Sequence, residues 1–97
     1  DDPHPCLRLA RLNRDRLRDH AEAATWFVEA RRRATDPGLK RVIVNELVEL
    51  FVRHMNEPAR ALPELARYAH KHAGTPQGAR AAAELARIKH CHLPYDP

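Results

Sequence analysis

The sequence predicts an all-α protein of about five antiparallel helices, and three observations lead to this fold class. Apolar residues recur with a period of about 3.6 along nearly the whole chain. No alternating pattern of the kind that marks a strand continues beyond four residues. Residues that start and stop helices divide the 97-residue chain into segments of helical length. This length is enough for one domain, so we expect a single domain over 1–97.

The first two helices are expected at about 5–17 and 20–35. Asp19 is a residue type that caps helix N-termini, because its side chain accepts a hydrogen bond from a free backbone N–H of the first turn. The Asp36-Pro37-Gly38 sequence is expected to end the second helix.

The third helix is expected at about 39–55, and the fourth is expected to begin at 57 with Asn56 as its cap. Pro58 suits the first turn of this fourth helix, where the missing N–H costs nothing. Pro63 would remove a hydrogen bond inside such a helix. We therefore expect either a kink at Pro63 or a later helix start.

The fifth helix is expected at about 76–92. Gly74 is typical of the position just after a helix, where the backbone turns left-handed. Thr75 and Pro76 then suit the N-cap and the first position of the next helix.

The predicted helices repeat with a period of 38 residues. Large apolar residues recur at this spacing in the first helix of each pair, at Leu9, Leu47 and Leu85 and again at Leu12, Leu50 and Ile88. Ala23 and Ala61 correspond in the second helix of each pair, as do Phe27 and Leu65. Each unit is thus expected to be a helical hairpin, at about 5–37 and 38–75, followed by an extra helix at 76–92.

These units resemble tetratricopeptide (TPR) repeats. The resemblance rests on large–small pairs in the first helix of each unit, Leu9-Ala10, Leu47-Val48 and Leu85-Ala86. It rests also on the series Ala23–Phe27–Ala30 and Ala61–Leu65–Tyr68 in the second helices. The resemblance implies a helical-hairpin solenoid that binds another protein or a peptide and has no enzymatic activity. Stacked helical hairpins of another kind are the alternative fold.

The resemblance also implies that the first helix of each unit lines a concave binding face. Counting from the large–small pairs places six polar residues on that face or within one helical turn of it: Arg11, Arg14, Asn45, Glu49, Arg80 and Arg87. Arginine binds a carboxylate through two parallel hydrogen bonds, and asparagine bonds to a peptide backbone. We therefore predict these residues as partner-binding.

Composition argues against several other classes of function. The chain contains no serine and no glycine-rich phosphate loop, so neither a serine nucleophile nor a nucleotide cofactor is expected. No run of 18 apolar residues is present, so no membrane span is expected. A cytoplasmic location is expected, with a periplasmic or secreted location as the alternative if a signal peptide has been removed.

Histidine and cysteine cluster near both ends, as His4 with Cys6 and as His90-Cys91-His92. The spacing matches no zinc-finger pattern, and the two clusters would lie at opposite ends of a stacked array. We expect free thiols and no metal, with a bridge or metal shared between two copies as the alternative. His70 and His72 lack the four-residue spacing of a helical metal pair and are expected at the surface.

The arginines leave a second hypothesis open. The chain has a net charge of +4, and eight arginines precede residue 34. A small, basic, nucleic-acid-associated helical domain is therefore the alternative function. The last helix would have an uncovered flank, which makes a homodimer through this helix possible in a solenoid of two and a half units.

Overall fold

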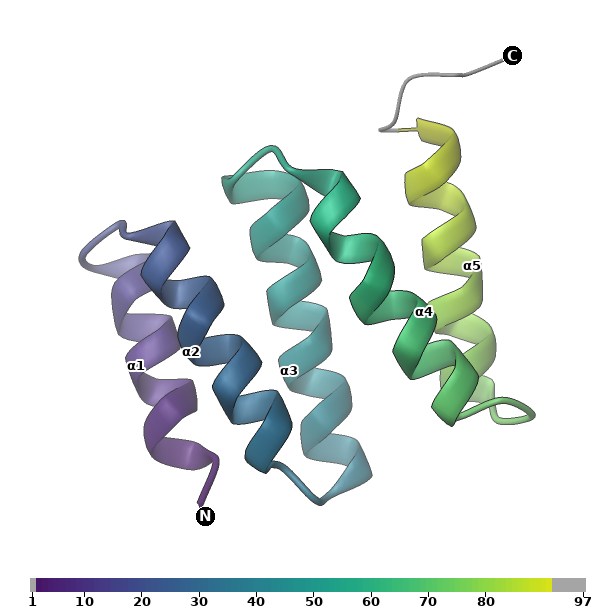
Figure 1. Cartoon of the computed structure of the whole chain (residues 1–97), viewed down its shortest axis with the longest axis horizontal. Helices are drawn as coiled ribbons and strands as arrows, with labels where there is room; N and C mark the ends of the chain where they lie inside the picture. The colour runs from purple at the N-terminus through teal and green to yellow at the C-terminus, as the bar shows by residue number, and fades with distance from the viewer. Residues whose placement is uncertain (1, 92–97) are drawn as a thin grey trace.

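The computed structural model describes residues 2–91, and within this range five α-helices follow one another without a strand (Figure 1). The predicted all-α class is therefore confirmed. The helices are α1 (His4–Asp15), α2 (His20–Arg33), α3 (Pro37–Glu49), α4 (Ala61–Lys71) and α5 (Pro76–Cys91). Position 92, the expected end of the last helix, lies outside the described residues.

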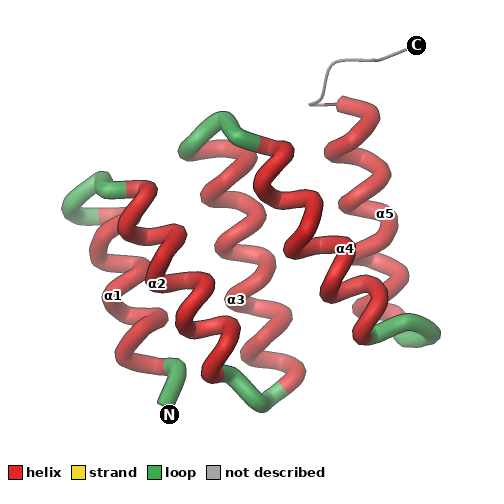
Figure 2. The backbone as a smooth tube through the Cα atoms, in the orientation of Figure 1, coloured by secondary structure: helices red, strands yellow, loops and turns green. Residues whose placement is uncertain are grey.

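The helices form a flattened array of 41 × 30 × 14 Å, and each runs antiparallel to the one before it (Figure 1). Figure 2 shows α2 and α4 in a layer nearer the viewer and α1, α3 and α5 in the layer behind. The first and third helices of the chain thus share a layer with the fifth. In the described part of the chain, no helix combines the length and the apolar character needed to cross a membrane.

Three side chains cap helix N-termini. The Asp19 carboxylate accepts a hydrogen bond from the Glu22 N–H at 3.1 Å, and the Thr75 hydroxyl accepts one from the Gly78 N–H at 3.1 Å, as expected. Asp36 also caps, because its carboxylate accepts from the Leu39 N–H at 3.0 Å. As a result α3 begins at Pro37, earlier than expected, and the segment that ends one helix also starts the next.

The segment between α3 and α4 differs from the prediction. The last turn of the expected third helix is a π-helical turn, Leu50–His54. Asn56 does not cap a helix, so that expectation was wrong: it takes the left-handed conformation, with φ of 53°, which Asn tolerates better than most residues. The chain then forms a short 3-10 turn at Pro58–Arg60.

Pro63 is accommodated by a later helix start, one of the two expected solutions. It is the third residue of α4, within the first turn, where a backbone N–H has no partner inside the helix. The proline therefore removes no hydrogen bond from the helix ladder.

The turns that follow α1 and α3 have the same backbone geometry, 38 residues apart. In the first, the Leu17 N–H donates to the Leu12 carbonyl and the Asp19 N–H to the Asn13 carbonyl. In the second, the corresponding N–H groups of Met55 and Glu57 donate to Leu50 and Phe51. The intervening residues, Arg18 and Asn56, are both left-handed, at φ of 56° and 53°.

Small residues fill the contacts between neighbouring helices, as the alanine content predicts. Ala10 on α1 and Ala23 and Ala30 on α2 are fully buried around Phe27. An alanine side chain lets two helix axes approach closely, near the lower end of the usual 8–10 Å. Not all alanines are buried in this way. Four alanines on α5 are exposed, namely Ala79, Ala82, Ala83 and Ala86.

The end helix α1 leaves two large side chains in water. Leu9 is 39% and Leu12 is 44% exposed, whereas Leu47 and Leu50, 38 residues further on, are fully buried. The difference follows from position, because α3 lies between α2 and α4 and α1 packs mainly against α2.

Gly78 provides a test of the α4–α5 packing. A methyl group at this position would collide with the backbone carbonyl of His72, which cannot move without disturbing the end of α4. We predict that Gly78→Ala lowers the free energy of unfolding by about 1–3 kcal/mol, as measured by urea denaturation.

Gly38→Ala is the matched control, because Gly38 also lies in the first turn of a helix. A methyl group there would meet only the Asp36 carboxylate oxygen, at 3.4 Å. Alanine favours a helix over glycine by up to about 1 kcal/mol, so this variant should be as stable as the parent chain or more stable. Equal destabilisation of both variants would contradict the packing described here.

Candidate functional site

A groove of about 330 Å³ lies between α3 and α5, and α4 contributes part of its floor. The apolar part of its lining consists of Val44, Val48, Val52, Leu65, Tyr68 and Ala81. Val52 belongs to the π-helical turn at the end of α3. Concave sites with an apolar lining and a few polar groups are typical of ligand-binding sites in proteins.

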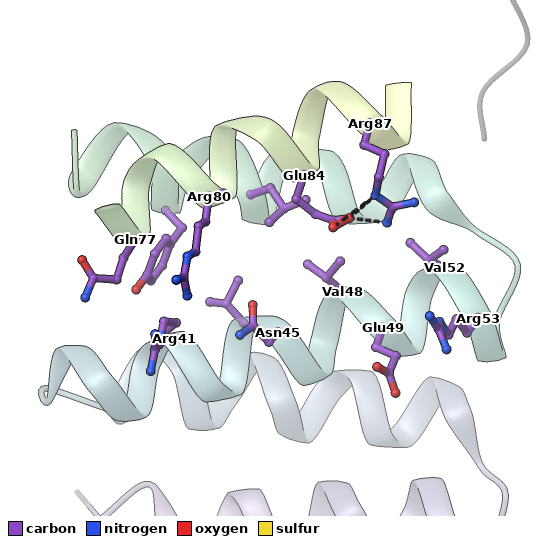
Figure 3. A pocket seen from close by; sticks show the side chains of 14 residues that line it. Arg41, Asn45, Val48, Glu49, Val52, Arg53, Gln77, Arg80, Glu84 and Arg87 are labelled. Carbon is purple, nitrogen blue, oxygen red and sulfur yellow. Dashed lines mark hydrogen bonds and ion pairs between the residues drawn. The ribbon is translucent and has the colours of Figure 1, made fainter. Parts of the chain in front are cut away.

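Polar side chains stand along both walls of this groove (Figure 3). One end gathers Arg41, Asn45, Gln77 and Arg80. The other end gathers Glu49, Arg53, Glu84 and Arg87. Figure 3 shows Arg80 reaching from α5 toward α3, where Asn45 lies. Glu84 and Arg87 form an ion pair along α5 itself.

The structure brings four of the six predicted partner-binding residues into one site. Asn45, Glu49, Arg80 and Arg87 all line the groove. Arg11 and Arg14 do not, because they lie on α1 and their guanidinium groups are bound to carboxylates between α1 and α3. These two residues therefore lie outside the groove, and their role in partner binding stays a prediction.

Arg11 and Arg14 form an ion cluster around Glu46 of α3. The Arg11 Nε donates to Glu46 Oε1 at 3.0 Å, and the Arg14 Nη1 donates to the same oxygen at 2.9 Å. Arg14 also donates through Nε to Asp15 at 2.6 Å. Its guanidinium lies 5.7 Å from the centre of the Phe27 ring, within the range of a cation–π contact. The gap between α1 and α3 is therefore filled by side chains of the chain itself.

The charges in this cluster change the pKa values of its members. Burial raises the pKa of the Glu46 carboxyl, but the hydrogen bonds from Arg11 and Arg14 outweigh burial and leave this pKa below its ordinary value. The pKa of Arg14 is raised, first by its hydrogen bond to Asp15. Glu46 and Arg14 therefore both stay charged at neutral pH.

The 38-residue offset explains why one gap between first helices is filled and the other is open. Glu46 corresponds to Glu84, so the same carboxylate stands on both α3 and α5. The residues that face this carboxylate differ. Where α1 has Arg11 and Arg14 opposite Glu46, α3 and its π-helical turn have Glu49 and Val52 at the corresponding positions. Because α3 offers Glu84 no arginine at these positions, Glu84 pairs with Arg87 instead and the groove stays open.

Three arginines of the groove have no carboxylate partner among the described residues, namely Arg41, Arg53 and Arg80. Sequence reasoning missed Arg41 and Arg53. Each is one helical turn from a predicted residue, Arg41 before Asn45 and Arg53 after Glu49. Extending the predicted face by four residues along α3 would have found both.

Most arginines of the basic segment before residue 34 are bound to carboxylates. Arg31 pairs with Glu64 at 2.8 Å, and Arg32 and Arg33 both reach Glu29. With Arg11 and Arg14 held by Glu46, five of the eight arginines that suggested nucleic-acid binding are in ion pairs. This leaves Arg8, Arg16 and Arg18 on or just after α1.

The histidine and cysteine clusters are only partly described by the structure, because the Cys91 side chain and His92 lie outside the described residues. His4 contacts the Asp2 carboxylate at 3.0 Å, and Cys6 is a buried free thiol. Among the described side chains, no group of three or more His, Cys, Asp and Glu could hold a metal ion.

Comparisons with known protein families, with curated proteins and with solved structures give no match to this chain. The site is therefore interpreted from its own geometry.

The Glu46 cluster makes stability depend on acid pH. Because the pKa of Glu46 is lowered in the folded chain, its stabilisation is present above the pKa of an unfolded glutamate and is lost as pH falls through the folded pKa. We predict that Glu46→Gln lowers the free energy of unfolding at pH 7 by about 1 kcal/mol, since water partly screens these charges. The stability of this variant should also fall less than that of the parent chain between pH 7 and pH 3. Thermal unfolding across a pH series measures this difference.

Glu49→Gln is the control for this series. Glu49 is on the same helix, is exposed, and forms no ion pair within the described residues. Its replacement should leave both stability and its acid dependence nearly unchanged. If the two variants behave alike, the ion cluster contributes nothing specific.

Proposed function

We propose that this chain is a TPR-like helical-hairpin module without enzymatic activity, and that it binds a segment of another protein in the groove between α3 and α5. The observation that carries this proposal is the groove itself. It combines an apolar lining with three arginines that lack a carboxylate partner among the described residues. A partner with apolar side chains and a carboxylate would complete both features.

The repeated hairpin supports the TPR-like assignment. The turns after α1 and α3 share two hydrogen bonds and a left-handed residue at positions 38 residues apart. The groove lies between the first helices of successive units, where the family resemblance expects a binding face. Small buried residues at the α1–α2 contact fit the same arrangement.

The polar end of the groove favours a carboxylate of the partner. Arg41 and Arg80 offer only hydrogen-bond donors there, and the side-chain amides of Asn45 and Gln77 can donate as well as accept. An arginine that binds a carboxylate bidentately gives both affinity and orientation. We propose that a glutamate or aspartate side chain, or a free C-terminus, binds here, with the adjacent apolar residues of the partner on Val44 and Val48.

A protein segment fits this groove better than nucleic acid does. The lining contains Glu49 and Glu84, which would repel a phosphate backbone. Most arginines of the first hairpin are already engaged by Glu29, Glu46 or Glu64. These paired arginines are less available to a phosphate backbone.

The first hairpin suggests a way to close the groove without unfolding the chain. Replacing Glu49 and Val52 by arginine gives α3 the two residues with which α1 binds Glu46. In the double variant Glu49→Arg/Val52→Arg, the new arginines should bind Glu84 and fill the space. Peptides are first selected from a random display library for binding to the parent chain. They should bind this variant at least about tenfold more weakly, because the loss of one charge-assisted hydrogen bond weakens binding by about this factor.

Arg16→Ala is the control, because Arg16 is an exposed arginine outside the groove with no ion-pair partner among the described residues. Binding is measured by calorimetry, and circular dichroism checks that each variant stays helical. Arg16→Ala should bind the selected peptides as the parent chain does. The proposal fails if the library yields no peptide, or if the groove-closing variant binds as well as the parent.

A further inference from the structure

A second cavity, of about 190 Å³, lies where α2, α3 and α4 meet, on another side of α3 from the groove. Its lining is strongly basic and combines Arg31 and Arg32 of α2, Lys40 of α3, and Arg67, Lys71 and His72 at the end of α4. Glu64 is the one acidic residue in this lining. Only Val44 and Tyr68 line both this cavity and the groove, so the charged groups of the two sites are separate.

Two lysines from distant parts of the sequence meet in this cavity. The chain has only three lysines, and Lys40 and Lys71 both line the cavity, whereas Lys89 lies on α5. The neighbouring Lys71, together with burial and the charge of Arg31, lowers the pKa of Lys40. Two ammonium groups that line one small cavity repel each other unless an anion lies between them.

The chain supplies no such anion among its described residues. Glu64 is already shared, because Arg31 binds it at 2.8 Å and Arg67 approaches it to 3.9 Å. Arg32 pairs with Glu29 at 3.5 Å, and neither lysine forms an ion pair. The Nε2 atom of His72 is buried in the same lining and has no hydrogen-bond partner. The cavity thus holds unused donors from both α3 and α4.

We propose that this cavity binds a phosphate group in its dianionic form, held between the ammonium groups of Lys40 and Lys71. A phosphate or phosphate monoester carries nearly two negative charges at neutral pH, which matches the two lysines. Its tetrahedral oxygens accept hydrogen bonds from several directions, whereas a carboxylate presents one plane and one charge. His72 Nε2 supplies a further donor when that nitrogen carries the proton.

This site is independent of the groove between α3 and α5. A small phosphate compound is its ligand, and the peptide proposed for the groove is not required. A failure of phosphate binding would therefore leave the proposed function unchanged, and the reverse holds as well.

The scarcity of lysines makes a direct test possible. In a chain labelled with ¹³C and ¹⁵N lysine, the three side-chain signals are followed by NMR while inorganic phosphate is added, with chloride at matched ionic strength as the reference. We expect saturable shifts at Lys40 and Lys71 and none at Lys89, and the pKa of Lys40 should rise because the bound anion favours its charged form. Equal shifts at all three lysines, or the same shifts with chloride, would overturn the proposal.

Two titrations distinguish the possible sources of the phosphate group. Glycerol phosphate represents a monoester and inorganic phosphate the free ion. Binding of both identifies a site for phosphate esters, and binding of inorganic phosphate alone identifies a site for the free ion. If neither produces a saturable shift at Lys40 and Lys71, the cavity is not a phosphate site.

Conservative variants separate binding from folding. Lys40→Gln and Lys71→Gln each remove one charge and keep most of the side-chain length, and each should weaken phosphate binding by about tenfold or more. Without phosphate, neither should lower the melting temperature, because each removes a repulsion. Phosphate should stabilise the parent chain and Lys89→Gln against heat and stabilise the two cavity variants much less. Equal stabilisation of all four proteins would contradict the proposal.

Discussion

One carboxylate, Glu46 of α3, joins α1 to α3 through hydrogen bonds from two arginines. These helices occupy the same layer, and the carboxylate accepts hydrogen bonds from both Arg11 and Arg14 across the gap between them. Arg14 also extends over the Phe27 ring, so the guanidinium covers the largest buried side chain of α2. A half-buried ion cluster of this kind contributes little energy by itself but fixes how two helices lie relative to each other.

Two differences around the corresponding carboxylate, Glu84, accompany an open site between α3 and α5. At the positions of Arg11 and Arg14, the second unit has Glu49 and Val52, so Glu84 has no partner across the gap between α3 and α5. The side chains that close one gap are absent from the other. The proposed binding groove therefore lies where the second unit lacks the two arginines that bind Glu46 in the first. The lysine-lined cavity on another side of α3 also has an excess of positive charge, with Glu64 as the one acidic residue of its lining.

Sequence periodicity predicted what depends on neighbouring residues. The five helices and the caps at Asp19 and Thr75 follow from local chemistry, and the late start of α4 at Pro63 is one of the two solutions that the sequence left open. The position of Asn56 was misjudged because asparagine is favoured both at an N-cap and at a left-handed position after a helix. Helix-face counting found Asn45, Glu49, Arg80 and Arg87, but it could not show that Glu46 engages Arg11 and Arg14. The sequence also could not predict that Lys40 and Lys71 line the same cavity, because this depends on how three helices pack.

The most direct test of this account is a double-mutant cycle on Arg14 and Glu46. The free energy of unfolding is measured for the parent chain, for Arg14→Met, for Glu46→Gln and for the double variant, each at pH 7 and low salt. We expect a favourable coupling energy of about 1 kcal/mol between the two residues, which should shrink at high salt and as pH falls through the lowered pKa of Glu46. A coupling energy indistinguishable from zero at pH 7 and low salt would contradict the claim that the Glu46 cluster closes the gap between α1 and α3.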